Sequence, residues 1–276
     1  MLGFILADLR CGWPGALAIG LIVALATALG IVVTLEERAL RLGSARAANA
    51  FDLLIGAPGS ETQLVLSSVF LQPAPLPLLS GAVLAGLARD PRVAWAAPIG
   101  FGDEMDGLPV VGTTDALIAG LGGLSEGVGF ARLGDAIAGA DAALGVGDSF
   151  HPVHAELASA GEVHQDTRYT IRGRLARTGS PWDRAILVPI EAVWATHGLH
   201  AGETAHGGGE KPDGYHGFDA DAPVRPETLG DPAAPGVPAI VLRGRTIADA
   251  YNLRQEFRGD DTIAVFPAEV LTRLYG

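Results

Sequence analysis

The sequence predicts an α+β protein with one transmembrane helix near its N-terminal end. Residues 16–35 are twenty consecutive positions without a charged side chain. A helix of that length spans about 30 Å, the hydrocarbon thickness of a bilayer. Strand-like and helix-like segments mix along the rest of the chain, which is typical of α+β domains. The composition is 49% hydrophobic and 18% charged, so the chain is too apolar to be disordered.

Charge and residue counts exclude several classes of function. The chain has 19 Lys and Arg against 31 Asp and Glu, a net charge of -12, which argues against a surface that follows nucleic-acid phosphates. Its one lysine, Lys211, stands between Glu210 and Pro212 rather than in the Gly-Lys-Ser/Thr of a phosphate-binding loop. ATP hydrolysis by this chain is therefore not expected. Cys11, the single cysteine, allows neither an internal disulfide nor a cysteine-based zinc cage.

The apolar run fits an uncleaved membrane anchor better than a signal peptide. A signal peptide has an apolar core of about 7–15 residues, followed closely by its cleavage site. Here the run is longer, and a cleavage-like Ala-Asn-Ala triplet at 48–50 lies far downstream. We expect residues 1–14 to form an interfacial segment that ends in a Trp-Pro pair. Residues 15–46 are expected to form the transmembrane helix and its polar extension.

Segments typical of strands and of helices follow the anchor. Alternating apolar residues and flanking turn residues predict strands at 51–55, 93–99, 109–112, 169–175, 185–188, 238–242 and 262–266. Apolar spacing and capping residues predict helices at 61–69, 80–88, 131–144, 189–196, 246–257 and 268–275. Ser60 and Gln63 match a capping box at the start of the first helix. Residues 203–238 are rich in Gly, Pro and Asp without apolar periodicity, which predicts a mobile loop.

Three histidines are the candidate metal ligands. His151, His154 and His164 lie close together in the sequence, and neutral imidazole suits Zn²⁺ or a similar divalent ion. Pro152 argues against a helix through the first two, so we expect a hairpin-like return before Tyr169 to bring the three together. A structural or solvated role for these side chains is the alternative.

Two further patterns carry less weight. His197 and His200 form a second pair, which Gly198 separates by ending the preceding helix. Ser125 stands in a G-x-S-x-G pattern, but a nucleophile elbow needs a strand before it and a helix after it. The flanking residues predict a helix before Ser125 and a turn after it. We therefore predict no catalytic residue. The competing hypothesis is a membrane-anchored hydrolase with Ser125 as its nucleophile.

Seven motifs occur in one order along essentially the whole chain: ADLR at 7–10 followed by WP at 13–14, FDLLIGAPGS at 51–60, QLVLSSVF at 63–70, VGTT at 111–114, VGDSF at 146–150, LARTGSP at 175–181 followed by DRA at 183–185, and AVFPAEV at 264–270. In this order they resemble the MacB-like and FtsX-like permease subunits of ABC transporters. The order of the motifs, rather than any single one, makes the resemblance specific.

The resemblance implies an architecture. Residues 47–276 would form a two-lobed extracytoplasmic domain with β-α-β units, with a first lobe at 47–115 plus 236–276 and an inserted lobe at 116–235. The family places the N-terminus in the cytoplasm and the domain outside the inner (cytoplasmic) membrane. Only one arginine precedes the apolar run and three follow it closely, so the positive-inside rule alone would give the opposite orientation. The chain would be the N-terminal part of a permease with three more spans after Gly276.

The resemblance also implies a function without covalent chemistry. The chain would couple ATPase-driven helix motion to the extracytoplasmic domain, for transport or mechanotransmission. Its partners would be a separate ABC ATPase subunit that binds ATP, a second permease copy in a dimer, the lipid bilayer and an extracytoplasmic protein. No cofactor would be bound by this chain itself, with zinc as the candidate exception. The alternative is a single-pass anchored extracytoplasmic binding module for a divalent metal such as zinc.

Overall fold

The computed structural model describes residues 3, 12–154, 167–199 and 219–275. Contacts divide the chain into two compact units, Met1–Ala45 and Arg46–Gly276. Each unit is described by itself below.

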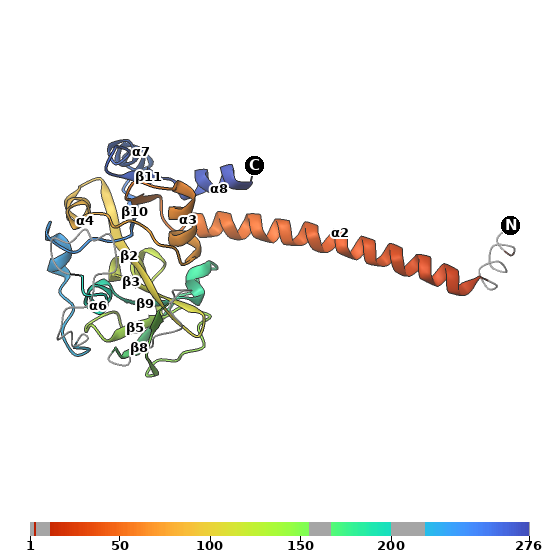
Figure 1. Cartoon of the computed structure of the whole chain (residues 1–276), viewed down its shortest axis with the longest axis horizontal. Coiled ribbons are helices and arrows are strands. Elements are labelled where there is room, and N and C mark those ends of the chain that lie inside the picture. The colour runs from red at the N-terminus through yellow and green to blue at the C-terminus, as the bar shows by residue number, and fades with distance from the viewer. Residues whose placement is uncertain (1–2, 4–11, 155–166, 200–218, 276) are drawn as a thin grey trace. The chain divides into compact units, whose positions relative to one another are not determined.

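One long helix dominates the first unit. Helix α2 (Trp13–Ala48) has 36 residues, of which the last three belong to the second unit (Figure 1). Its mean hydropathy reaches 2.7 over an 18-residue window, and the helix is long enough to cross a membrane. Large apolar side chains are exposed on all its sides, among them Leu17, Ile22, Leu25, Leu29 and Val33. An apolar surface of this extent is favourable in lipid and costly in water.

The polar side chains within the apolar part of α2 are satisfied by the helix itself. Thr27 Oγ1 donates to the Val23 carbonyl at 2.8 Å, and Thr34 Oγ1 donates to the Gly30 carbonyl at 2.8 Å. These bonds reach back one turn, so neither hydroxyl needs a water molecule. The helix is therefore compatible with a bilayer along its apolar length.

A ferredoxin-like core opens and closes the second unit. Its N-terminal half comprises β1 (Leu53–Gly56), α3 (Glu61–Phe70), α4 (Gly81–Arg89) and β2 (Val93–Met105). Its C-terminal half comprises β10 (Ala239–Gly244), α7 (Ile247–Glu256), β11 (Ile263–Val265) and α8 (Pro267–Tyr275). The strands lie in the order β11-β1-β10-β2, with neighbours antiparallel. Strands β1 and β2 are therefore parallel with β10 between them, and β10 and β11 are parallel with β1 between them. These are two split β-α-β units.

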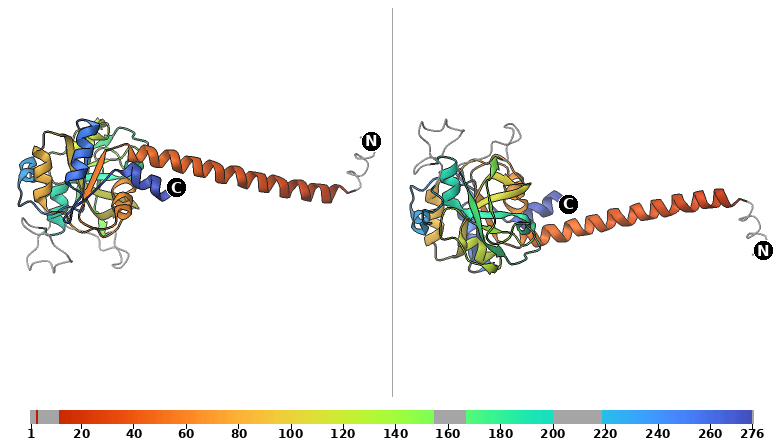
Figure 2. Two further views of the ribbon diagram at one scale, coloured as in Figure 1. Left: turned by 90° about the horizontal axis from the view of Figure 1, so that it is seen from above. Right: turned by 90° about the horizontal axis from the view of Figure 1, so that it is seen from below.

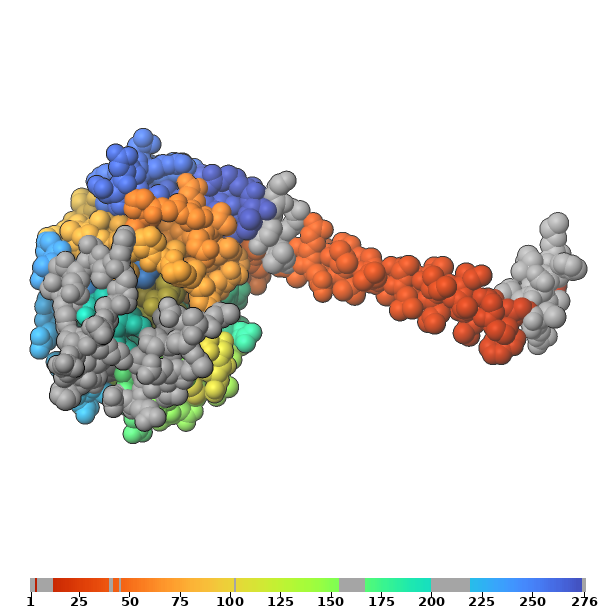
Figure 3. Space-filling view, viewed as in Figure 1, coloured from red at the N-terminus to blue at the C-terminus, as the bar shows by residue number. Residues whose placement is uncertain are grey.

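The two halves of this core are distant in sequence and adjacent in space. Helix α8 lies beside α3 (Figure 2). The space-filling view shows the same segments, in orange and dark blue, on one side of the unit (Figure 3). Ser60 caps α3 by accepting from the Gln63 N–H at 3.2 Å, which is one half of the predicted capping box. The Gln63 side chain donates to Ser67 Oγ at 3.4 Å.

A long insertion between β2 and β10 extends the same sheet. Its main elements are β3 (Leu108–Thr113), α5 (Asp115–Gly120), β4 (Leu124–Gly127), β5 (Asp135–Ala138), β8 (Tyr169–Leu175), β9 (Ile186–Pro189) and α6 (Ile190–Thr196). The sheet continues from β2 in the order β3-β9-β5-β8-β4. Short strands β6 (Ser149–Phe150) and β7 (Val153–His154) pair with β8 and β2. Two 3-10 helices, η1 (Pro181–Arg184) and η2 (Pro226–Gly230), complete the insertion. The boundaries of the two lobes stay a prediction.

Both faces of the central strands are buried. Leu53 and Ile55 of β1 belong to one apolar layer, whereas Leu54 between them belongs to the other. Ile240 and Val241 of β10 divide between the layers in the same way. This alternation follows from the two-residue period of a strand. The sheet is therefore the middle layer of the unit.

Two predictions about the insertion are wrong. Residues 131–144 contain β5 rather than a helix, because all four β5 residues are buried and paired to strands on both sides. Residues 219–238 are the described part of the predicted mobile loop. Backbone hydrogen bonds to other segments fix the path of this part. The Gly134 N–H donates to the Ala220 carbonyl at 2.9 Å, and Leu79 and Val237 form a bridge. Residues 203–218 of that prediction lie outside the described residues.

Candidate functional site

The last turn of α2 contacts a tight loop within the second unit. We call residues 178–183 the junction loop; they belong to the LARTGSP–DRA motif. Gly179 adopts φ +67°, and a Cβ atom there would lie 3.0 Å from Arg46 Cδ. Glycine is favoured at such a position both by its backbone and by this close approach. Ala47 and Ala48 are 0% and 4% exposed and share a buried apolar layer with Trp182. The end of the helix is therefore part of the core of the body.

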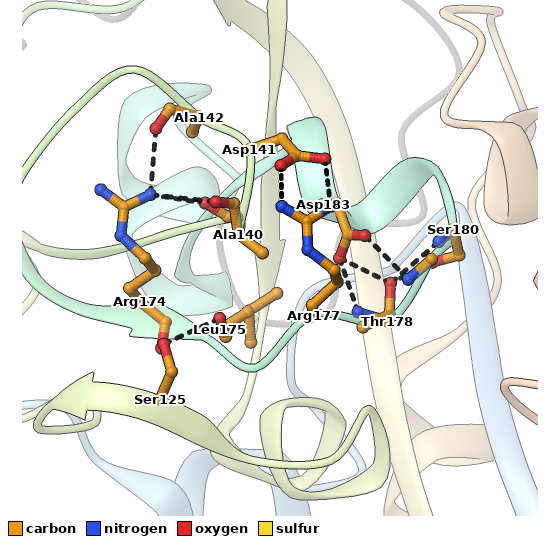
Figure 4. Close-up of polar contacts among 12 residues, drawn as sticks. Ser125, Ala140, Asp141, Ala142, Arg174, Leu175, Arg177, Thr178, Ser180 and Asp183 are labelled. Atoms are coloured by element: carbon orange, nitrogen blue, oxygen red, sulfur yellow. Dashed lines mark hydrogen bonds and ion pairs between the residues drawn. The ribbon is translucent and has the colours of Figure 1, made fainter.

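The buried carboxylate of Asp183 holds the junction loop in one conformation (Figure 4). Asp183 is 3% exposed. Its Oδ1 accepts from the N–H and the Oγ1 of Thr178, both at 2.8 Å, and its Oδ2 accepts from the Gly179 N–H at 2.8 Å. Thr178 Oγ1 also lies 2.6 Å from Ser180 Oγ. Hydrogen bonds to an ionised group are the stronger kind and offset the cost of its burial.

Backbone bonds connect the junction loop to the segment after β5. The Asp141 N–H donates to the Asp183 carbonyl at 2.7 Å, and the Gly139 N–H donates to the Ala185 carbonyl at 2.8 Å. A Cβ atom on Gly139 would lie 2.5 Å from the Asp183 carbonyl oxygen, so glycine is required for this approach. Arg177 adds a two-pronged ion pair with Asp141, and hydrogen bonding to Arg177 lowers the pKa of Asp141.

Arg174 extends these contacts to the outermost strand of the sheet. Its guanidinium donates to the carbonyls of Gly139 and Ala142 at 3.0 Å and of Leu144 at 2.5 Å. Its Nε lies 3.2 Å from Glu126 Oε1 in β4. One rigid fork of donors therefore organises the whole turn after β5. The polar contacts run without a break from the junction loop to β4.

Ser125 has the surroundings of a strand residue rather than of a nucleophile. It lies within β4, and its Oγ donates to the carbonyls of Leu175 at 3.1 Å and Arg174 at 3.3 Å (Figure 4). A nucleophile elbow would place it on a sharp turn from a strand into a helix. The hydroxyl proton points to the backbone instead of to a base.

The three predicted metal ligands are only partly described. His151 is exposed, and its Nδ1 lies 2.8 Å from the Thr167 carbonyl oxygen. His154 ends β7, opposite Asp103 of β2. His164 lies outside the described residues. Among the side chains that the structure describes, no group of three or more His, Cys, Asp or Glu could hold a metal ion. The set of three therefore stays a prediction.

Two carboxyl groups that the sequence analysis did not single out have raised pKa values. Burial raises the pKa of Asp115, and burial also raises the pKa of Glu191, with smaller contributions from the charges of Glu227 and Asp115. Glu191 Oε1 is buried and has no hydrogen-bond partner in the described part of the chain. Both residues follow the carboxyl ends of the parallel strands β3 and β9, in the first turns of α5 and α6. Two acids placed soon after parallel strands are the sequence signal that could have identified this pair.

Removing the Asp183 carboxylate should destabilise the body. In Asp183→Ala the N–H groups of Thr178 and Gly179 and the Thr178 hydroxyl lose their charged acceptor, so we expect the free energy of unfolding to fall by about 2–4 kcal/mol. Urea denaturation of the full chain in detergent would measure this. Asp141→Ala is the matched control; its side chain is 42% exposed, so a loss of at most about 1 kcal/mol is expected. Equal losses in the two variants would contradict the role given to Asp183.

Glu191 should make the stability of the body depend on pH. Because its pKa is raised in the folded state, its stabilising contribution is complete below the unfolded pKa and is lost as pH rises through the folded pKa. Glu191→Gln removes the ionisation, so its thermal midpoint should exceed that of the wild type increasingly as pH rises above the ordinary carboxyl value of 4.5. Glu104→Gln, in β2, is the control variant. A midpoint difference that stays constant from pH 4 to about pH 8 would contradict this assignment.

Comparison with known proteins finds likeness in structure only. No family model matches the chain, and no curated protein matches it. The periplasmic region of MacB from Actinobacillus actinomycetemcomitans is 7% identical, with 83% of this chain and 95% of that chain covered and a TM-score of 0.46. The extracellular domain of the noncanonic ABC-type transporter YknZ from Gram-positive bacteria is 8% identical, with 78% and 98% covered and a TM-score of 0.40. The chain thus combines an apolar N-terminal helix with a mixed α/β domain similar to the MacB periplasmic region.

Proposed function

We propose that this chain belongs to an ABC-transporter permease and couples ATP-driven motion of membrane helices to an extracytoplasmic domain. One observation carries the proposal: α2 continues without a break from apolar, lipid-compatible turns to a last turn that is buried in the body. The order of motifs along the chain supports the same function. Similar structures from transporters agree with it and are not its basis.

The helix has the physical properties that transmission of movement requires. Its backbone hydrogen bonds are internal, so it resists bending and needs no partner along its length. The last three residues of α2 belong to the second unit, and two of them, Ala47 and Ala48, lie in its core. A displacement of the last turn would therefore act directly on close-packed side chains, which do not absorb it by local compression.

The junction loop is one segment that such a displacement would reach. Arg46 borders Gly179, and Asp183 fixes Gly179 by a hydrogen bond. From there the backbone bonds to Asp141 and the donors of Arg174 continue toward β4. The first step is the close approach of the exposed Arg46 side chain to Gly179, and the later steps are short polar contacts. The loop is thus suited to pass on movement rather than to bind a substrate.

The remaining parts of the proposal concern partners and place. ATP would be bound by a separate ABC ATPase subunit, since this chain has no phosphate-binding loop in its sequence. A second permease copy would complete a dimer, and an extracytoplasmic protein would contact the body. The membrane would be the inner (cytoplasmic) membrane, with the body outside it. The chain would perform no covalent chemistry.

Cysteine labelling in intact cells tests the orientation. Tyr251 lies on α7 and is 54% exposed, so Tyr251→Cys in a Cys11→Ser background should react with a membrane-impermeant maleimide. The wild-type chain, whose one cysteine is Cys11, should react only after the membrane is permeabilised. Cys11→Ser without a new cysteine gives the background. Labelling of Cys11 in intact cells together with protection of Tyr251→Cys would refute the orientation.

Movement driven by ATP tests the function itself. Val146 is 51% exposed in a turn of the insertion, so a spin label on Val146→Cys, again with Cys11→Ser, reports the distance between two copies. In nanodiscs that hold the assembled transporter, ATP with vanadate should shift this distance distribution. Asp183→Ala should reduce the shift while ATP hydrolysis continues, and Asp141→Ala should retain it. An unchanged distribution during active hydrolysis would overturn the proposal.

A further inference from the structure

One carboxyl group of the insertion is enclosed without compensation for its charge. Glu191 stands in the first turn of α6, and its Oε1 is buried without a hydrogen-bond partner among the described residues. A carboxyl oxygen in such a place costs more free energy when it is ionised than when it is protonated. The protonation state of Glu191 therefore matters for whatever covers it.

The register of the sheet places a second acid beside Glu191. Strands β3 and β9 are parallel, with Thr113 opposite Pro189. Asp115 and Glu191 each follow that pair by two residues, and neighbouring strands lie about 4.8 Å apart. Asp115 Oδ1 accepts from the Phe130 N–H at 3.2 Å. The two acids are thus neighbours, and one of them is held by the segment that begins at Phe130.

A surface segment that ends in η2 pairs with the chain just after Phe130. We call residues 219–230 the strap; Figure 1 shows it in light blue near α6. The Val224 N–H donates to the Ala131 carbonyl at 3.0 Å, and the Gly134 N–H donates to the Ala220 carbonyl at 2.9 Å. Every strap residue is exposed or half-buried. A segment held in this way opens at a smaller free energy than the buried strands beneath it.

The closed strap brings further negative charge to Glu191. Burial raises the pKa of Glu191 most, and the charges of Glu227 in η2 and of Asp115 in α5 raise it further. Backbone hydrogen bonding at Glu191 itself and at Arg225 lowers the same pKa in part. The strap therefore lies close to the Glu191 carboxyl group, with a like charge and a backbone group facing it.

Two arginines that contact the strap are engaged elsewhere. Arg132 forms an ion pair with Asp221, and Arg89 of α4 donates to the Gly230 carbonyl. Neither guanidinium is among the causes that shift the pKa of Glu191. Among the described groups, an ionised Glu191 thus meets two carboxylates and no compensating cation.

We propose that the strap is a proton-controlled latch, which stays closed while Glu191 is protonated and opens when Glu191 ionises. The ionised carboxylate is repelled by Glu227 and Asp115, and it reaches water when the strap moves away. The bonds at Ala131 and Gly134 break in the open state, whereas β3 and β9 stay paired. Opening therefore increases as pH rises through the raised pKa. The latch is independent of the proposed permease function, and either can fail without the other.

Hydrogen–deuterium exchange of the full chain in detergent tests the latch. At each pH the exchange rate of the wild type is divided by that of Glu191→Gln, so the pH dependence of the chemical exchange step cancels. For peptides that cover 131–134 and 219–230, this ratio should be close to one at about pH 4 and at least about threefold higher at about pH 7. A ratio that stays constant over this range would overturn the proposal.

The wild-type chain alone distinguishes opening of the strap from unfolding of the whole body. At about pH 7, and after correction for intrinsic rates, the strap peptides should exchange at least about tenfold faster than peptides from β10. Equal protection of the strap and of β10 would mean that Glu191 acts through global unfolding, and it would refute the latch.

Two further variants show whether the effect belongs to this carboxyl group. Glu104→Gln in β2 is the matched control, and it should keep the full rise in strap exchange between the two pH values. Glu227→Gln should show a smaller rise, because one of the two charges that act on Glu191 is gone. Loss of the rise in Glu104→Gln would assign the pH dependence to charge in general and contradict the role of Glu191.

Discussion

The body of this protein depends on one buried charge at the point where the long helix ends. Asp183 is removed from water, and its carboxylate is tolerated there because three donors from Thr178 and Gly179 satisfy it. Those bonds hold the junction loop in a single conformation. Trp182, the neighbouring residue, is 0% exposed and shares its apolar layer with Ala47 and Ala48. The polar and the apolar contacts of this short segment therefore constrain the same turn of helix.

The long insertion does not weaken the core from which it emerges. It leaves after β2 and returns at β10, which are themselves neighbours in the sheet. Its first strand, β3, pairs with β2, and its last strand, β9, pairs with β3. The hydrogen-bond ladder thus continues from the ferredoxin-like strands into the insertion without a gap. A sheet that is covered by apolar layers on both faces is stiff, so the end of α2 and the distant strand β4 belong to one framework.

Local sequence patterns were enough to predict many of the helices and strands. The wrong predictions fall where pairing between distant segments of the chain decides the structure. Residues 169–175 alternate clearly and form β8 with the predicted bounds. Residues 131–144 were predicted as a helix because alanine favours helices, yet β5 is a strand because β8 and β9 flank it. The segment 219–238 lacks apolar periodicity and owes its course to backbone bonds with Leu133, Gly134 and Leu79. No local pattern shows that β10 lies between β1 and β2.

The contrast between local and long-range contacts also applies to two buried aspartates, Asp183 and Asp103. Asp183 acts on residues four and five positions before it, so a short motif contains the whole interaction and the order of motifs could identify it. Asp103 and His197 are brought together only by the packing of α6 against β2, and the sequence therefore grouped the histidines by proximity in the chain. In the junction loop the carboxylate and the hydroxyl groups bond to one another, which leaves little chemistry for a substrate.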